Sequence, residues 1–563
     1  MRRGDRWTRC VLGVASVLIV AGPLVHAEAR IDVAVGIAGH VVRLHYVPIR
    51  VDLSGLRESV DGTIIVRQQI GNPIQDPDEI EHVLARELLT NRVYESTIPI
   101  YDPLNPLELS VVDGDGTILA EATVHVRMNR RTAPFPGVCG FSTEVTEDAV
   151  FLDAGDLPRD WWALDGLRSL WLGGDCDLTS SQWQTVAEWT MAGGSVVILT
   201  GADLYRLDSP ILRGLLPIAD PHLNAPAGGV PTVEGTLRDG AEIAMEGEDA
   251  AFVLLRGYGA GHVLMVTRAA GDLGEAEMRR IGALVPASRL LSAERVSEAA
   301  LREMEVVRPS YLIAPAILVV TLGIFLWFAR RVERRERVAW VALGLAVAGL
   351  SVWSGFVSND MKRPVDLYRS TTVVSIQNSI GIDIGWHSLY SSKRRWVAVD
   401  EEEERFPIQS LVPGAAGTSF DAVSAPEGTR LRLEAHERRD LEFFGRETPL
   451  VEVRTADGVV TVENRSGAII EGALVLSGGR VHRLPAIGRG ENAFVLGDGE
   501  ETYLYEAEDV AVEVVLERFS ERLTLFSETW LVLFDEAESV RREGQLAEKV
   551  RDARIELICG ETS

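Results

Sequence analysis

Cysteine, the strongest nucleophile and a soft metal ligand, is sparse in this sequence of 563 residues. Apart from Cys10 near the N-terminus, its cysteines are Cys139, Cys176 and Cys559. Their spacing fits no zinc motif, and so few cysteines do not make a disulfide framework. Cys139 and Cys176 fall within one predicted domain, which leaves two interpretations open. They form a disulfide with each other, or they are small buried thiols.

Two other groups of residues could be read as metal ligands. His40, His45 and His125 lie in or beside predicted strands, but no carboxylates stand at ligand spacing from them. The run Glu401–Glu404 lacks the spaced D-x-[DN]-x-[DN]-G pattern of a calcium loop, and consecutive carboxylates point in different directions. We therefore predict a solvated turn at Glu401–Glu404, and neither a metal site nor a cofactor.

Asp203 and the pair Trp161–Trp162 are the remaining candidates for binding chemistry. Asp203 follows an apolar strand-like run at 195–199, and the carboxyl end of such a strand is where α/β sheets usually bind ligands. A tryptophan pair could offer a platform for a sugar. Each also has a simpler interpretation, with Asp203 as a loop or capping residue and the tryptophans as core or interdomain packing.

The N-terminal part of the chain has the alternation of half-buried strands. The stretch VPIRVDL (47–53) alternates apolar and polar residues, and DGTIIVRQQ (61–69) follows a turn signal. The stretch LELSVVDGDGTILAEATVHVRM (107–128) predicts a hairpin around Asp113–Gly116. We expect a β-sandwich domain over residues 30–130.

Beyond residue 131, apolar runs alternate with helix-length segments. A helix is predicted over 181–192, because Thr179 and Ser180 supply N-cap chemistry and a Gly-Gly pair follows its end. Strands that alternate with helices favour a parallel sheet. The expected domain is a Rossmann-like α/β domain over 131–295, with strands at 148–154, 167–174, 195–201 and 262–267 and a second helix at 274–285.

Segment 164–201, LDGLRSLWLGGDCDLTSSQWQTVAEWTMAGGSVVILTG, resembles the class I glutamine amidotransferase-like fold. It is similar to non-catalytic versions in large bacterial membrane proteins, where a helix and a Gly-Gly pair precede a central strand. The resemblance implies an order of parts, namely signal, β-sandwich, amidotransferase-like domain, transmembrane hairpin and β-rich tail. Active members of the fold place a nucleophilic cysteine at a strand-to-helix elbow and a His-x-Glu pair later.

This chain lacks those catalytic groups. The elbow after 195–199 reads TGAD, without a thiol, and neither His222 nor His262 begins a His-x-Glu pair. Cys176 follows a different strand and stands between two aspartates, which would raise the pKa of a thiol rather than lower it. We expect an inactive domain with no catalytic residue.

Two apolar stretches follow, at 310–329 and 338–357, and neither contains a charged residue. At ~1.5 Å rise per residue, a helix of that length spans roughly the ~30 Å hydrocarbon core of a bilayer. A two-helix transmembrane hairpin is therefore predicted. Small residues on one stripe of its second helix are the candidate packing seam: Gly344, Ala348, Ser351 and Gly355.

Charge determines the predicted topology. The loop 330–337 is rich in arginine, so the positive-inside bias places it in the cytoplasm and both long flanks outside. Residues 1–29 are typical of a signal peptide, either cleaved or retained as an anchor. The net charge of −27 argues against nucleic acid as a partner. The topology determinants in the loop are Arg330, Arg331, Arg334, Arg335 and Arg337.

Residues 358–563 are expected to form a β-rich extracytoplasmic domain. The stretches TTVVSIQNS (371–379) and GIDIGWHSLY (381–390) resemble paired strands. The stretch VEVRTADGVVTVEN (451–464) predicts a hairpin with Asp457–Gly458 in its turn.

Two hypotheses of function follow. The first is a non-enzymatic protein anchored in a bacterial inner membrane, whose periplasmic domains act as a scaffold or interaction subunit of an envelope complex. Its partners would be the lipid bilayer and other membrane or envelope proteins. The alternative is a hydrolase that binds an envelope saccharide or peptide in the cleft of the α/β domain, through Asp203 or Trp161–Trp162.

Overall fold

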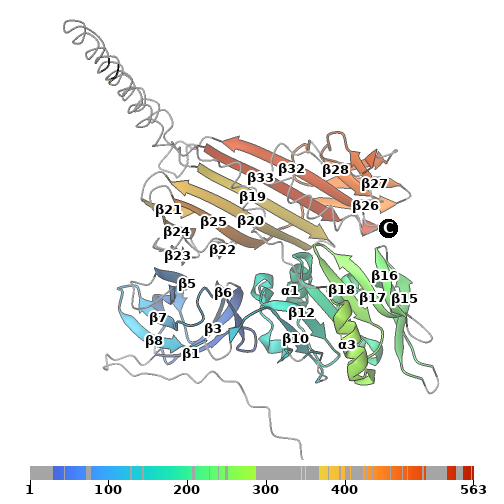
Figure 1. The fold of residues 1–563 in the computed structure, drawn as a ribbon, viewed down its shortest axis with the longest axis horizontal. Coiled ribbons are helices and arrows are strands. Elements are labelled where there is room, and N and C mark those ends of the chain that lie inside the picture. The colour runs from blue at the N-terminus through green and yellow to red at the C-terminus, as the bar shows by residue number, and fades with distance from the viewer. Residues whose placement is uncertain are drawn as a thin grey trace, which may run out of the picture.

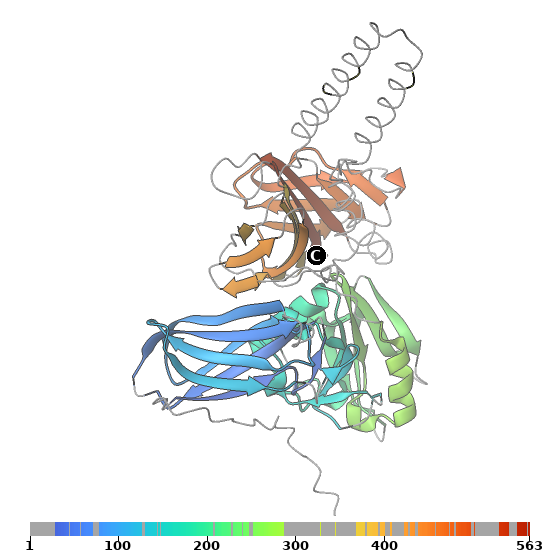
Figure 2. The same ribbon diagram turned by 60° about the vertical axis from the view of Figure 1, so that its left-hand side comes forward.

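The computed structural model describes most of residues 29–286 and 367–562, together with the single positions 327, 344 and 349. The longest gaps within the two ranges are 71–77, 400–405, 408–421, 502–528 and 540–548. The described chain contains seven sheets and three α-helices. Figures 1 and 2 show two N-terminal bodies side by side beneath a large C-terminal sheet.

The first body is a β-sandwich, drawn in blue in Figure 1. Strands β1 and β3 bury every second residue, as in the pattern eBeBeB of β1, and the buried side chains pack in one apolar cluster against the second sheet. The outward face of the first sheet therefore remains polar. The first sheet contains β1 (Arg30–Val35), β3 (Tyr46–Ser54) and β6 (Val93–Pro99), and the second contains β4 (Val60–Ile70), β5 (Asp78–Leu89), β7 (Leu107–Asp113) and β8 (Ile118–Val124).

The second sheet of the sandwich continues into strands from the C-terminal part of the chain. Strand β23 (Ala422–Ala425) lies parallel to β5, and β24 (Gly428–Leu433) and β21 (Arg395–Val399) extend the sheet further. The sandwich is therefore not confined to residues 30–130. A separate short pair joins β2 (Val41–Val42) to β9 (Arg130–Arg131).

The second body is built on a mixed seven-stranded sheet in the order β11-β10-β12-β13-β18-β17-β16. The strands from β11 to β18 are parallel, and β17 and β16 are antiparallel. The strands are β10 (Phe135–Cys139), β11 (Val150–Leu152), β12 (Leu167–Leu172), β13 (Ser195–Leu199), β16 (Ala241–Glu246), β17 (Ala251–Tyr258) and β18 (Gly261–Val266). The helices are α1 (Ser180–Met191), α2 (Pro210–Leu215) and α3 (Glu275–Leu284), and β14 (Ile218–Asn224) pairs with β15 (Thr232–Leu237).

The predicted Rossmann-like α/β domain of the glutamine amidotransferase-like type is wrong. The connection from β11 to β12 holds only the short 3₁₀ turns η2 (Ala154–Asp156) and η3 (Trp161–Leu164), whereas β12 and β13 are joined through α1. The antiparallel pair β17 and β16 ends the sheet. Apolar runs predicted the parallel strands, but runs alone do not show that a helix fills each crossover.

The predicted transmembrane hairpin is also wrong for the described structure. Within the described ranges, no helix combines the length and the apolar character needed to cross a bilayer. Segments 310–329, 330–337 and 338–357 lie outside the described residues except at positions 327, 344 and 349, and the predicted signal peptide lies outside them except at Ala29. Apolar length indicates a membrane span only where it forms one continuous helix. The inner-membrane location and the periplasmic flanks rested on this hairpin, so they are withdrawn.

The C-terminal part forms a nine-stranded sheet, coloured yellow to red in Figure 1. Strands β19 and β20 pair antiparallel, as the sequence predicted. The order is β22 (Phe406–Pro407), β25 (Glu437–Arg446), β20 (Ile380–Ser391), β19 (Leu367–Gln377), β33 (Lys549–Cys559), β32 (Trp530–Ser539), β28 (Leu474–Ser477), β29 (Arg480–Arg483) and β31 (Glu500–Glu501).

A smaller four-stranded sheet contains the predicted hairpin of β26 (Val451–Ala456) and β27 (Val459–Asn464). Gly458 adopts φ +76° in its turn, a conformation that favours glycine. The flanking strands are β30 (Gly490–Val495) and β34 (Glu561–Thr562).

His82 in β5 generates a prediction on acid stability. It is 6 % exposed, and its Nε2 lies 3.0 Å from Nε2 of Gln68. Burial lowers the pKa of His82 to about 4, so between pH 6.5 and 4 the unfolded chain binds more protons than the folded one. The free energy of unfolding should therefore fall by about 3 kcal/mol as the pH drops across this window.

Urea unfolding of wild type and His82→Gln at pH 7 and pH 4.5 measures the effect. The variant should lose most of the acid-dependent decrease that His82 causes, whereas His222→Gln, at an exposed position, should retain it. An unchanged pH dependence in His82→Gln would contradict the assignment.

Candidate functional site

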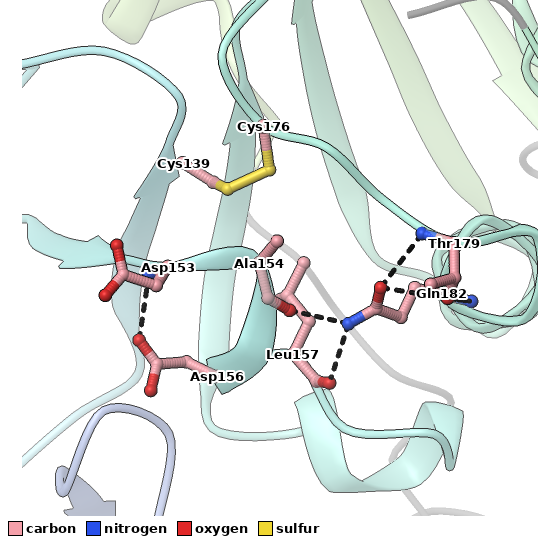
Figure 3. Close-up of a disulfide and its surroundings, with 8 residues drawn as sticks. All are labelled: Cys139, Asp153, Ala154, Asp156, Leu157, Cys176, Thr179 and Gln182. Carbon is pink, nitrogen blue, oxygen red and sulfur yellow. Dashed lines mark hydrogen bonds between the residues drawn. A yellow bond between two sulfur atoms is a disulfide. The ribbon is translucent and has the colours of Figure 1, made fainter.

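The carboxyl edge of the parallel strands is the usual place for a ligand site in such a sheet. Here the edge is occupied by a disulfide, which joins Cys139 at the end of β10 to Cys176 in the loop after β12, with a Cα–Cα distance of 5.3 Å (Figure 3). Both cysteines are buried. The structure therefore brings the two candidate cysteines together as a bond between neighbouring strand ends.

Backbone packing closes the same edge beside the disulfide. Gly140 has φ +85°, and a Cβ added there would lie 2.4 Å from the amide nitrogen of Cys176. A Cβ added to Gly174 would lie 2.2 Å from Cβ of Asp203. Asp203 thus packs against the backbone of Gly174. The hydroxyl of Thr200, at the elbow position, is buried and donates to the carbonyl oxygen of Val266 at 2.8 Å.

The tryptophan pair is part of the core rather than a surface platform. Trp161 is 0 % exposed and Trp162 is 4 % exposed. The Trp161 ring lies edge-on to Trp162 and to Phe444 of β25, and its Nε1 donates to the carbonyl oxygen of Gly445 at 3.2 Å. The pair therefore fills the junction between the second body and the C-terminal sheet.

The candidate histidines do not gather at one place. Nδ1 of His40 accepts a hydrogen bond of 3.4 Å from Arg131. Nδ1 of His45 lies 2.9 Å from Oδ2 of Asp165. Burial opposes the charge on His45, but Asp165 more than offsets it, so the pKa of His45 is raised. Among the described residues, no group of three or more His, Cys, Asp or Glu residues could hold a metal ion.

The remaining sequence candidates lie outside the described residues. They are the run Glu401–Glu404, the seam residues other than Gly344, and the topology arginines of the 330–337 loop.

An ion pair between a buried carboxylate and a partly exposed guanidinium joins the second body to the C-terminal sheet. Glu188 lies on α1 with its side chain 1 % exposed, and Arg446 at the end of β25 has its side chain 37 % exposed. Nε of Arg446 donates to Oε1 and Oε2 of Glu188 at 2.9 and 3.0 Å. Nη2 of Arg446 donates to the carbonyl oxygen of Arg159 at 2.7 Å, and its Nη1 lies 3.9 Å from Oδ1 of Asp160.

Both carboxyl groups beside Arg446 have raised pKa values. Burial is the main cause for Glu188, and Arg446 only partly offsets it. Burial also raises the pKa of Asp160, with a further contribution from Glu95, against the opposing effect of Arg446. The guanidinium of Arg446 therefore compensates the charge of two carboxyl groups, and it lies much closer to Glu188 than to Asp160.

The segment 153–160 is held from several sides. The side-chain amide of Gln182, in the first turn of α1, donates to the carbonyl oxygens of Ala154 and Leu157 at 2.5 and 3.3 Å (Figure 3). The hydroxyl of Thr185 donates to the carbonyl oxygen of Arg159, which also accepts from Arg446. This surface segment, whose only regular structure is the 3₁₀ turn η2, is thereby fixed to α1 and β25.

This segment forms one wall of a cavity of about 410 Å³, and the outward face of the sandwich sheet forms the other. On that face, Arg50 stands opposite Ala34 on β1 and Glu95 on β6, and Pro48 stands opposite Thr97. The cavity thus lies between two bodies that the C-terminal sheet holds together. Its polar lining includes Arg50, Glu95, Ser96, Thr97, Asp156, Arg159 and Asp160.

Sequence reasoning missed this cavity. Arg50 and Glu95 occupy outward positions of alternating strands, so their pattern is that of any solvated sheet face. Glu188 offered a signal, because a carboxylate stands next to a tryptophan in a helix that is buried on most sides.

Comparisons with known proteins give no family. No family model matches the chain, and no curated protein matches it. A cytoplasmic protein of Salmonella typhimurium LT2 is similar to 26 % of this chain over 93 % of its own, with 10 % identity and a TM-score of 0.20. An exo-β-1,4-mannosidase of Opitutaceae bacterium strain TAV5 matches 30 % of this chain over 38 % of its own, with 13 % identity and a TM-score of 0.18. Scores this low carry no argument about fold or function.

The disulfide gives the first prediction at the site. It closes a loop with a sequence separation of 37 residues, so its loss should lower the free energy of unfolding by about 4 kcal/mol. Chemical denaturation with and without dithiothreitol measures this loss. A Cys139→Ser/Cys176→Ser double variant should match the reduced wild type and should not respond to the reductant. A double variant as stable as the oxidised wild type would contradict the structural role.

The ion pair between Glu188 and Arg446 gives the second prediction at the site. Arg446→Met leaves the Glu188 carboxyl group buried without its guanidinium, which should cost about 3 kcal/mol at pH 8. The pKa of Glu188 is already raised and should rise further in the variant, so protonation should make the loss smaller at pH 5. Arg454→Met is the control. It removes a 58 % exposed arginine from its ion pair with Glu452 and should have little effect on stability.

Adding Glu188→Gln to Arg446→Met should restore part of the stability at pH 8, because the buried charge of Glu188 is then gone. If the double variant is less stable than Arg446→Met at that pH, the buried charge is not what destabilises the single variant. Urea unfolding followed by tryptophan fluorescence provides the measurement.

Proposed function

We propose that this chain is a non-enzymatic interaction protein that acts as a scaffold for a protein partner. The observation that carries the proposal is the closed carboxyl edge of the parallel strands, where the Cys139–Cys176 disulfide and the packing of Asp203 on Gly174 fill the place of a ligand crevice. A catalytic site at that edge would need groups that can reach a substrate.

The way in which the bodies are joined supports the same proposal. The C-terminal part of the chain adds β23 to the sandwich by pairing it with β5, and it contacts the second body through Arg446 and Phe444 of β25. A rigid arrangement of this kind presents surfaces from two bodies in a fixed geometry, which lowers the entropic cost of binding. The net charge of −27 favours a protein partner over nucleic acid.

The alternative of a hydrolase receives no support from its named residues. Asp203 packs against backbone, and Trp161 and Trp162 are buried in the junction with the C-terminal sheet. These side chains have structural contacts that a saccharide or peptide would have to break.

Complementation of a deletion strain tests the proposal. Thr200→Val and Asp203→Asn alter the polar groups at the carboxyl edge, and both should restore wild-type behaviour because the function depends on shape and surface. Arg446→Glu should fail, because it places two like charges together at the junction and separates the bodies. Thermal unfolding of each purified variant is the folding control. A Thr200→Val or Asp203→Asn protein that folds like wild type but does not complement would overturn the non-enzymatic proposal.

A further inference from the structure

The cavity between the sandwich and the segment 153–160 has charged side chains of both signs on each wall, and Arg50 and Asp160 face it from opposite walls. Arg50 lies on the sandwich wall, and none of the described residues forms an ion pair with it. Its cross-strand neighbour Glu95 is paired instead with Nε of Arg159, at 3.3 Å. Arg50 is therefore a cation with unused hydrogen-bond donors beside the cavity.

Asp160 lies on the opposite wall. Its Oδ2 accepts a weak hydrogen bond of 3.4 Å from the Thr97 hydroxyl, and its Oδ1 lies 3.9 Å from an Arg446 guanidinium that is already bonded to Glu188. The negative charge of Asp160 is thus only partly compensated. Burial raises the pKa of this carboxyl group, as expected for such a position.

We propose that this cavity binds a small zwitterion of the α-amino acid or short-peptide class, with the ligand carboxylate on Arg50 and the ligand ammonium on Asp160. This inference rests on the proposed interaction function, and it names the class of ligand that the cavity would bind. A cavity of about 410 Å³ is within the range of roughly 300–1,000 Å³ that small-molecule sites occupy.

The lining disfavours ligands with a single charge. An anion that reached Arg50 would also meet Glu95 and Asp160, and a cation that reached Asp160 would also meet Arg50 and Arg159. A ligand with both charges can pair with Arg50 through its carboxylate and with Asp160 through its ammonium group. The hydroxyls of Ser96 and Thr97 line the same cavity and can bond the amide of a peptide.

Isothermal titration calorimetry with the dipeptide Ala-Ala tests the proposal on the full chain. N-acetyl-Ala-Ala lacks the ammonium group, and Ala-Ala amide lacks the carboxylate. Each blocked form should bind at least about tenfold more weakly than Ala-Ala. The N-acetyl form cannot pair with Asp160, and the amide form cannot pair with Arg50.

Two variants assign the ends of the ligand. Arg50→Gln should bind Ala-Ala and its amide with equal affinity, because the group that reads the carboxylate is gone. Asp160→Asn should bind Ala-Ala and its N-acetyl form equally. The matched controls are Arg30→Gln, at an exposed position of β1 outside the cavity, and Asp115→Asn in the exposed turn between β7 and β8. Both controls should keep the full discrimination.

The outcomes separate this inference from the proposed function. Absence of Ala-Ala binding at millimolar concentration, or equal affinity of wild type for the blocked and free forms, overturns the zwitterion site. Unchanged discrimination in a folded Arg50→Gln protein also overturns it, and this variant alters an exposed side chain that the fold does not use. If any of these results is found while Thr200→Val and Asp203→Asn still complement, the ligand class fails and the scaffold proposal stands.

Discussion

The arrangement of this molecule depends on one guanidinium, that of Arg446. It is bonded to Glu188 on α1 and to the carbonyl oxygen of Arg159, and it lies 6.0 Å from the centre of the Trp162 ring. The carboxylate of Glu188 could not remain charged in its buried position without this partner. The same contacts fix the segment 153–160 against β25. A single side chain of the C-terminal sheet thereby sets both the junction between the bodies and one wall of the cavity.

The disulfide and the ion pair have different structural effects. Cys139–Cys176 ties two strand ends and closes the edge at which a sheet of this kind would bind a ligand. The Glu188–Arg446 pair orients the bodies so that an outward sheet face and a loop enclose a cavity instead. The concave site that the proposal uses therefore lies between the bodies rather than at the sheet edge, and clefts between domains are frequent binding sites.

Features set by neighbouring residues could be read from the sequence. The helix at 180–191 follows from its Thr179 cap, and the hairpins of β7–β8 and β26–β27 follow from their turn residues. The site depends on contacts that no local pattern carries, because Arg446 and Glu188 are 258 residues apart. The Rossmann-like domain and the transmembrane hairpin failed because apolar runs and their lengths were read as complete architectures, although such runs specify neither the crossovers nor a continuous helix.

The cavity and the junction are thermodynamically linked, because Asp160 lines the cavity and also lies beside Arg446 of the junction. A cation placed on Asp160 takes over part of the charge compensation that Arg446 supplies at 3.9 Å, which leaves the guanidinium more fully to Glu188. Any ligand that binds only the joined arrangement must also stabilise that arrangement, by mass action and by the same free energy with which the junction favours the ligand. In the proposed scaffold, occupancy of the cavity would therefore change the strength of the contact between the bodies.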